Sequence, residues 1–193
     1  MSEGGFHVHG PHDHHLEHAA KHGDADAFAG RVAVTTAVLA TVGALMAYQA
    51  GATQANAALY KNNAAIKKTE AADQWNFYQA KSSKQNLAEL AQALVSGADK
   101  QEFYKQESAR YDKEKKEIKA VAEKLEAESK EWDKQSDEQL HLHHRWAQAT
   151  TALQIAIAMS AIALLTRRSW LLWGVYGVGV LGGVLGVLAF VHV

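Results

Sequence analysis

The sequence has no cysteine and only one proline, Pro11, among its 193 residues. Without cysteine the chain can form no disulfide framework, no thiol nucleophile and no thiolate metal site. Because proline is the strongest helix breaker, nearly everything after Pro11 is free to be helical. The formal net charge is −1, and no basic patch with interleaved aromatic residues is present. We therefore expect no nucleic acid among the partners of this protein.

Motifs that would indicate catalysis are missing as well. No nucleophile-and-base pair, phosphate-binding loop or carboxylate pair in an apolar setting can be found by spacing. The long apolar runs contain no Asp, Glu, Lys or Arg that could relay a proton across a membrane. We therefore expect neither an enzyme nor a proton-coupled transporter.

Three long apolar runs are the main feature that is present. They cover residues 32–52, 147–165 and 170–191. Each is close to the roughly 20 residues that cross a bilayer as a helix. A short basic turn, residues 166–169, separates the last two runs. The sequence therefore predicts three transmembrane helices, with the lipid bilayer as a partner.

A polar, charge-dense segment, residues 54–145, separates the first run from the second. A turn at residues 96–100, which contains Gly97, divides it into two helical arms of about 63 and 69 Å. Apolar residues recur every seven positions on each arm, which predicts one narrow seam between two antiparallel helices. The predicted seam residues are Leu59, Ile66, Trp75, Leu87 and Leu94 on the first arm, and Tyr104, Tyr111, Ile118, Leu125 and Trp132 on the second.

The predicted fold is therefore all-α: an integral membrane protein with a long, coiled-coil-like antiparallel hairpin outside the bilayer. Its predicted parts are a His-rich tail (1–30), a first transmembrane helix (31–53), the hairpin (54–145) and two further transmembrane helices (146–191). Three crossings place the tail and the Arg167-Arg168 turn on one side and the hairpin on the other. By the positive-inside rule, we expect the tail and this turn in the cytoplasm and the hairpin outside.

Small and polar residues within the apolar runs indicate contacts between helices. Small residues at helical spacing and overlapping GxxxG pairs predict close packing, within the chain or between subunits of a homo-oligomer. The packing residues are Gly43, Ala47, Gly51, Gly179, Gly182, Gly183 and Gly186. The polar residues Thr35, Gln49, Gln148 and Gln154 either pair between helices or converge on the axis of a pore.

Histidines form two clusters. Neutral imidazole suits Zn, Ni and Cu, so one hypothesis is a divalent transition metal on the tail, and the alternative is a pH-responsive tail without a metal. The second cluster either contributes His141 and His144 to a metal site or, as we prefer, sits at headgroup level. The clusters are His7, His9, His12, His14, His15, His18 and His22 in the tail, and His141, His143 and His144 near the second apolar run.

Two strings and the layout of the chain carry a resemblance to a known family. They are HVHGPHDH at residues 7–14, DQWNFYQAKS at residues 73–82 and the terminal pair of apolar runs. Together they resemble an uncharacterised bacterial inner-membrane family that is catalogued as a domain of unknown function. The resemblance implies a small integral membrane protein with a coiled-coil-like middle, and it brings no reaction, ligand or catalytic residue.

Two functional classes follow from these observations. The preferred hypothesis is an oligomeric, membrane-anchored structural or interaction module whose hairpin contacts a protein partner or sister subunits. The alternative is an oligomeric ion channel or metal-handling membrane protein, in which the polar residues of the spans face a shared axis. The oligomeric state would decide between them.

Overall fold

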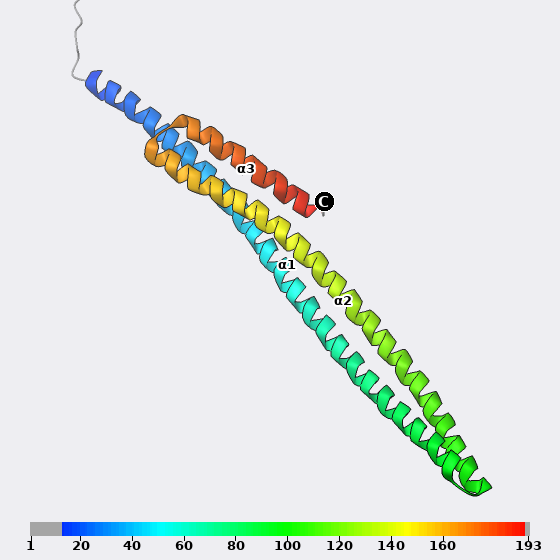
Figure 1. The fold of residues 1–193 in the computed structure, drawn as a ribbon. Coiled ribbons are helices and arrows are strands. Elements are labelled where there is room, and N and C mark those ends of the chain that lie inside the picture. The colour runs from blue at the N-terminus through cyan, green and yellow to red at the C-terminus, as the bar shows by residue number, and fades with distance from the viewer. Residues whose placement is uncertain (1–12, 192–193) are drawn as a thin grey trace, which may run out of the picture. The chain divides into compact units, whose positions relative to one another are not determined.

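The computed structural model describes the backbone of residues 13–191 and the side chains of residues 27–191. Three helices, α1 (Asp13–Leu94), α2 (Ala98–Thr166) and α3 (Ser169–Phe190), make up this part of the chain, which contains no strand (Figure 1). Each helix is long and apolar enough to cross a membrane. The prediction of an all-α chain with three such helices is confirmed.

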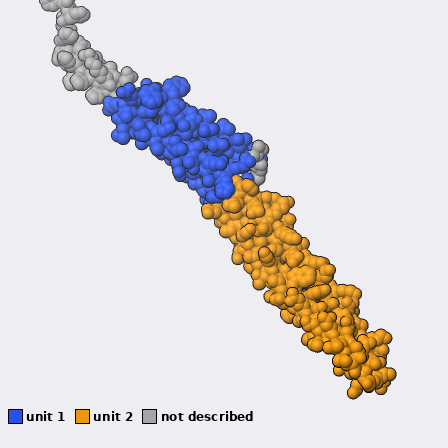
Figure 2. Space-filling view, in the orientation of Figure 1, with its two compact units in different colours: residues 1–51, 142–193 blue, residues 52–141 orange. Residues whose placement is uncertain are grey.

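The chain divides into two compact units (Figure 2). Unit 1 consists of residues 1–51 and 142–193, and unit 2 consists of residues 52–141. Both α1 and α2 contribute to each unit, whereas α3 belongs to unit 1 alone. Unit 2 is a hairpin of two antiparallel helices, and unit 1 contains the apolar part of each helix.

The turn of unit 2 depends on Gly97. Its φ of +134° lies in a region that only glycine adopts without steric cost. The residues around it satisfy backbone groups that the helix ends leave without partners. The Gln101 amide donates to the Gly97 carbonyl at 3.1 Å, and the Gln101 side chain donates to the Val95 carbonyl at 3.1 Å. The chain can therefore reverse within three residues.

The two helices of unit 2 pack through small side chains. On α1, Ala57, Ala64 and Ala71 follow one another at seven-residue intervals, and all three are buried. On α2, Ala122 is fully buried at the corresponding seven-residue position. We call this row of residues, together with the serines that face it, the small-residue seam. Alanine projects only a methyl group, so a row of alanines lets two helices approach closely.

Hydrogen bonds across the seam fix its register. The Ser129 hydroxyl donates to the Ala64 carbonyl at 2.8 Å, and the buried Ser136 hydroxyl donates to the Ala57 carbonyl at 2.8 Å. The partners in each pair lie equally far along the chain from the turn. A serine side chain reaches a carbonyl of the opposite helix only where the two backbones are close. Each such bond contributes about 0.5–1.5 kcal/mol to stability.

The large apolar residues predicted for the α1 side of the seam lie elsewhere, so this part of the prediction is wrong. The exposed fractions are 54% for Leu59, 47% for Ile66, 65% for Leu87 and 74% for Leu94. Leu59 and Ile66 each follow a seam alanine by two positions, which places them about 200° around the helix from α2. Close helix contact also leaves no room for leucine. The other predicted residues, Trp75, Tyr104, Tyr111, Ile118, Leu125 and Trp132, are half-buried beside the seam.

In unit 1, glycines of α3 allow close contact with the other helices. A Cβ atom added at Gly182 would lie 2.8 Å from Leu153 Cδ2 and 3.2 Å from the Leu153 backbone nitrogen. One added at Gly179 would lie 3.0 Å from Leu39 Cδ2, and one added at Gly186 would overlap the Met46 methyl group. These three glycines therefore contact residues of their own chain.

The other predicted packing residues differ from one another. Gly43 of α1 is buried, and an added Cβ there would be in ordinary contact with Leu153 at 3.7 Å. By contrast, Gly51 and Gly183 face open space, and Ala47 is exposed. These three residues lie on helix faces that the chain itself leaves uncovered, so they do not pack helices within one chain.

The seam makes a prediction for substitutions in unit 2. Ala122→Leu inserts three carbon atoms where the helices touch, and we expect it to destabilise unit 2 by about 1–3 kcal/mol. Ala120→Leu, on the exposed side of the same helix, is the matched control and should leave stability within about 0.5 kcal/mol. Denaturation followed by circular dichroism in detergent measures both. An equal loss of stability in the two variants would contradict helix packing at the small-residue seam.

The glycine contacts make a second prediction, for unit 1. Gly182→Ala forces Leu153 and its backbone to move, so we expect a loss of about 1–3 kcal/mol. Gly183→Ala, one residue further along the same helix, places its methyl group in open space and should cost nothing. Thermal unfolding of the two variants in the same detergent micelles compares their stability. A Gly183→Ala variant as unstable as Gly182→Ala would show that α3 packs through another face.

Candidate functional site

Charged residues of α1 in unit 2 flank the seam and form ion pairs with α2. Lys61 pairs with Asp133, and Lys67 lies 3.5 Å from Glu128. Lys81 lies 2.5 Å from Glu114, and this hydrogen-bonded contact lowers the pKa of the Glu114 carboxyl. These pairs are partly exposed and each contributes little to stability. These contacts place charged groups of α1 beside α2, away from the opposite face of α1.

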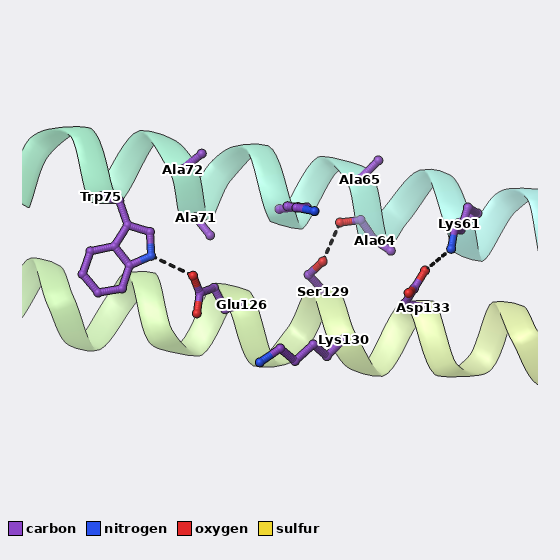
Figure 3. Close-up of a pocket in the computed structure, with 11 residues that line it drawn as sticks. Lys61, Ala64, Ala65, Ala71, Ala72, Trp75, Glu126, Ser129, Lys130 and Asp133 are labelled. Carbon is purple, nitrogen blue, oxygen red and sulfur yellow. Dashed lines mark hydrogen bonds and ion pairs between the residues drawn. The ribbon is translucent and has the colours of Figure 1, made fainter.

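A groove of about 650 Å³ runs along one side of the seam in unit 2 (Figure 3). It exists because the residues on its α1 side are mostly alanine. At one end the Trp75 indole nitrogen donates to Glu126 Oε1 at 2.8 Å, and at the other Lys61 pairs with Asp133. The lining residues are Lys61, Ala64, Ala65, Lys68, Ala71, Ala72, Trp75, Glu126, Ser129, Lys130 and Asp133.

The chemistry available in this groove is limited. Glu126, Asp133 and Ser129 all take part in the bonds described above. Lys68 and Lys130 have no carboxylate within ion-pair distance in the described part of the chain. The groove therefore combines an alanine-lined wall with the cations of Lys68 and Lys130 beside it.

The face of α1 turned away from α2 is the second notable surface of unit 2. Large apolar side chains are exposed along it, and we call this set the outer stripe. It consists of Leu59, Ile66, Phe77, Leu87, Leu90 and Leu94. Asp, Glu, Lys and Arg number eight in residues 52–94 of α1 but 23 in residues 98–141 of α2. Helix α1 therefore presents an apolar face with few charges, and α2 presents a charged one.

The histidines near the second apolar run do not act as one group. His143 is half-buried, and its Nδ1 atom lies 2.8 Å from the Ala50 carbonyl, which continues the seven-residue spacing of Ser129 and Ser136. His141 and His144 are exposed. Among the described residues, no group of three His, Asp or Glu side chains could hold a metal ion.

The histidines of the tail lie outside the side chains that the structure describes. His7, His9 and His12 precede its first residue. Only the backbone is described for His14, His15, His18 and His22, which lie in α1. A Zn, Ni or Cu site on the tail therefore stays a prediction.

Of the polar residues predicted for a pore or for interhelical bonds, Thr35, Gln148 and Gln154 form no hydrogen bond with one another in the described part of the chain. Gln148, Gln154 and Gln49 are exposed, and Thr35 lines an apolar groove of about 490 Å³ between α1 and α3. Besides the contact between His143 and Ala50, an interhelical polar contact of unit 1 joins two residues outside this predicted set. The Thr36 and Ser160 hydroxyls lie 2.7 Å apart, and each also lies within hydrogen-bonding distance of a carbonyl of its own helix, so two hydroxyl hydrogens are shared among three contacts.

The alanine row of α1 was also missed. Its signal is present in the sequence, since Ala50, Ala57, Ala64 and Ala71 recur at seven-residue intervals. Alanine is common on exposed helix surfaces too, so the larger leucine and isoleucine residues at the same spacing gave the stronger pattern.

Comparison with known proteins gives one match. The model of a family described as Domain of unknown function (DUF4337) matches residues 28–192. Searches of curated proteins and of solved structures found no match. The matched range includes almost all of the residues whose side chains the structure describes, and it begins after the histidines of the tail. The chain therefore belongs to the family DUF4337, a domain of unknown function.

Proposed function

We propose that this protein is a membrane-anchored interaction module. Unit 1 anchors the chain in a bilayer through three helices, and unit 2 extends into the aqueous phase as a coiled-coil-like hairpin that contacts other proteins or sister copies. The resemblance noted in the sequence favours the bacterial inner membrane as its location.

One observation carries this proposal. The large apolar residues of α1 in unit 2 are exposed, whereas the seam is filled by alanine and serine. Exposed apolar surface costs about 25 cal/mol per Å² relative to a buried state. An apolar stripe of this length on an otherwise polar hairpin, even with Asp73 within it, is therefore expected where a protein partner covers it.

The arrangement of charge supports the same function. Ion pairs hold Lys61 and Lys81 against α2, and Lys67 is shared between Glu128 of α2 at 3.5 Å and Glu70 of its own helix at 2.9 Å. The outer stripe therefore has few charges that a partner would have to desolvate. The core of a protein interface is typically depleted of charged residues in this way.

Three apolar helices support the membrane anchor. Two are linked by Arg167 and Arg168, and Arg167 adopts a positive φ of 53° that allows the tight turn. Two arginines in a turn this short weigh strongly in the positive-inside rule, so we propose that the turn is cytoplasmic and the hairpin is outside.

The orientation can be measured directly because the chain has no native cysteine. We expect Ala98→Cys, at the tip of the hairpin, to react with a membrane-impermeant maleimide in intact cells. Ser169→Cys, beside the arginine turn, should react only after the membrane is permeabilised. The opposite pattern would invert the proposed orientation, and equal labelling of both would remove the three-crossing topology.

The interaction itself is tested by a photo-crosslinking amino acid placed at single positions of the full chain in cells. At Phe77, on the outer stripe, we expect a discrete protein adduct after irradiation. At Lys113, an exposed position of α2, we expect none. Absence of any adduct at Phe77, Leu59 and Leu87 would overturn the proposed function, because these positions span the stripe.

A further inference from the structure

We propose that the outer stripe of α1 docks against the same stripe of a second copy, with the two α1 helices parallel and in register. This inference rests on the proposed function and names the partner of the interaction module. It is carried by the spacing of the stripe, by the distribution of charge and by the constraint that a shared membrane imposes.

The spacing is that of a helix that packs against another helix. Leu59, Ile66, Leu87 and Leu94 all lie on one seven-residue repeat, and Asp73 and Ala80 occupy the two positions between Ile66 and Leu87. Each of these residues is exposed in a single chain. A seven-residue apolar repeat keeps one face in contact with a partner helix along its whole length. Helix α1 therefore carries two such repeats, and α2 covers only the alanine one.

The flanks of the repeat fit a close helix partner. Alanine precedes each of the first three positions of the repeat. Ala58 precedes Leu59, Ala65 precedes Ile66, and Ala72 precedes Asp73. Small residues on the flank let a second helix approach the stripe. These alanines are exposed as well, so nothing in one chain covers them.

Charge argues for a helix of the same kind as the partner. Asp73 lies within the repeat of the outer stripe, and Glu70 and Lys84 lie on its flanks. Glu70 is already paired with Lys67, at 2.9 Å. A strongly basic or acidic partner would find no complementary charge here. A second α1, which is equally poor in charge on this face, meets it with unpaired ions only at Asp73 and Lys84 among these residues.

The membrane determines the direction of pairing. Two copies inserted the same way in one bilayer are related by an axis that runs perpendicular to it. Such an axis makes identical helices parallel and places each residue level with its own counterpart. A repeat with a period of seven then meets itself without any offset, so Leu59 faces Leu59 of the second copy and Leu87 faces its own counterpart.

Asp73 is a charged residue within the apolar repeat, and it makes a specific prediction about the strength of association. It occupies the seven-residue position between Ile66 and Ala80 and is exposed in the single chain. In the parallel pair two Asp73 carboxylates would lie opposite each other, and like charges at such positions are destabilising. Association should therefore be limited by Asp73, and a leucine there should strengthen it.

Disulfide trapping in membranes tests the arrangement, because any cysteine introduced is the only one in its chain. Under mild oxidation, we expect the Leu59→Cys variant to form covalent homodimers, and the Leu87→Cys variant to do the same. Differently tagged Leu59→Cys and Leu87→Cys chains expressed together should form no mixed dimer. Val121→Cys, on an exposed apolar position of α2, is the matched control and should remain monomeric.

Energy transfer between labelled copies of the full chain in lipid vesicles measures the strength of their association. We expect Leu87→Asp to weaken association about tenfold or more and Asp73→Leu to strengthen it by about tenfold. Val121→Asp should leave it unchanged. Circular dichroism checks that each variant keeps its helices, which is expected because all three positions are exposed.

The outcomes separate this inference from the function on which it rests. Covalent dimers at Val121→Cys as abundant as those at Leu87→Cys, mixed dimers between Leu59→Cys and Leu87→Cys, or no energy transfer would overturn the parallel pair. If photo-adducts at Phe77 then contain only a different protein, the interaction module stands and its partner is not a second copy. If no adduct forms at all, both fail.

Discussion

The close approach of two helices at the small-residue seam is the interaction on which the rest of unit 2 depends. Ser129 and Ser136 reach carbonyl groups of the opposite helix, and Ala64 and Ala122 leave nothing larger than a methyl group between the backbones. Tight contact of this kind gains dispersion energy from many atom pairs, each of about 0.1–0.2 kcal/mol. It also sets the register, because each serine bond has one carbonyl partner.

A seam made of small residues decides where the large ones go. Leucine and isoleucine residues at a different position of the same seven-residue repeat are turned away from α2. Their exposure is therefore a direct consequence of the seam and not a local irregularity. The lysines of α1 that flank the seam pair with carboxylates of α2, which leaves the outer stripe low in charge. The contact within the hairpin and the exposed surface that we propose for a partner thus have one origin.

Much of the architecture could be predicted from the sequence because it depends on coarse patterns. The absence of proline after Pro11, three apolar runs and Gly97 in a short polar turn were enough for three long helices and a hairpin turn. The position of the α1 seam was not predicted correctly. Two repeats with the same period, one of alanine and one of leucine and isoleucine, lie on α1, and apolar size alone favours the wrong one.

The candidate site was harder to predict for a related reason. Whether a residue such as Ile66 or His143 faces a neighbouring helix depends on its angular position relative to the seam, which differs by 100° for each step along the chain. Glycine contacts in unit 1 show the same limit. Gly182 and Gly183 are adjacent residues of two overlapping GxxxG patterns, yet only Gly182 meets Leu153. Pattern spacing identifies a helix face, and the neighbouring helix decides which face is used.

The most direct test of this account is an intramolecular disulfide in unit 2. We compare the pair Ala71→Cys and Ala122→Cys with the pair Ile66→Cys and Leu125→Cys in the otherwise cysteine-free chain. A disulfide requires the two Cα atoms to lie within about 7 Å of each other. The account predicts rapid closure within one chain for the alanine pair and none for the second pair. Closure of the Ile66 pair, with the alanine pair remaining reduced, would contradict it.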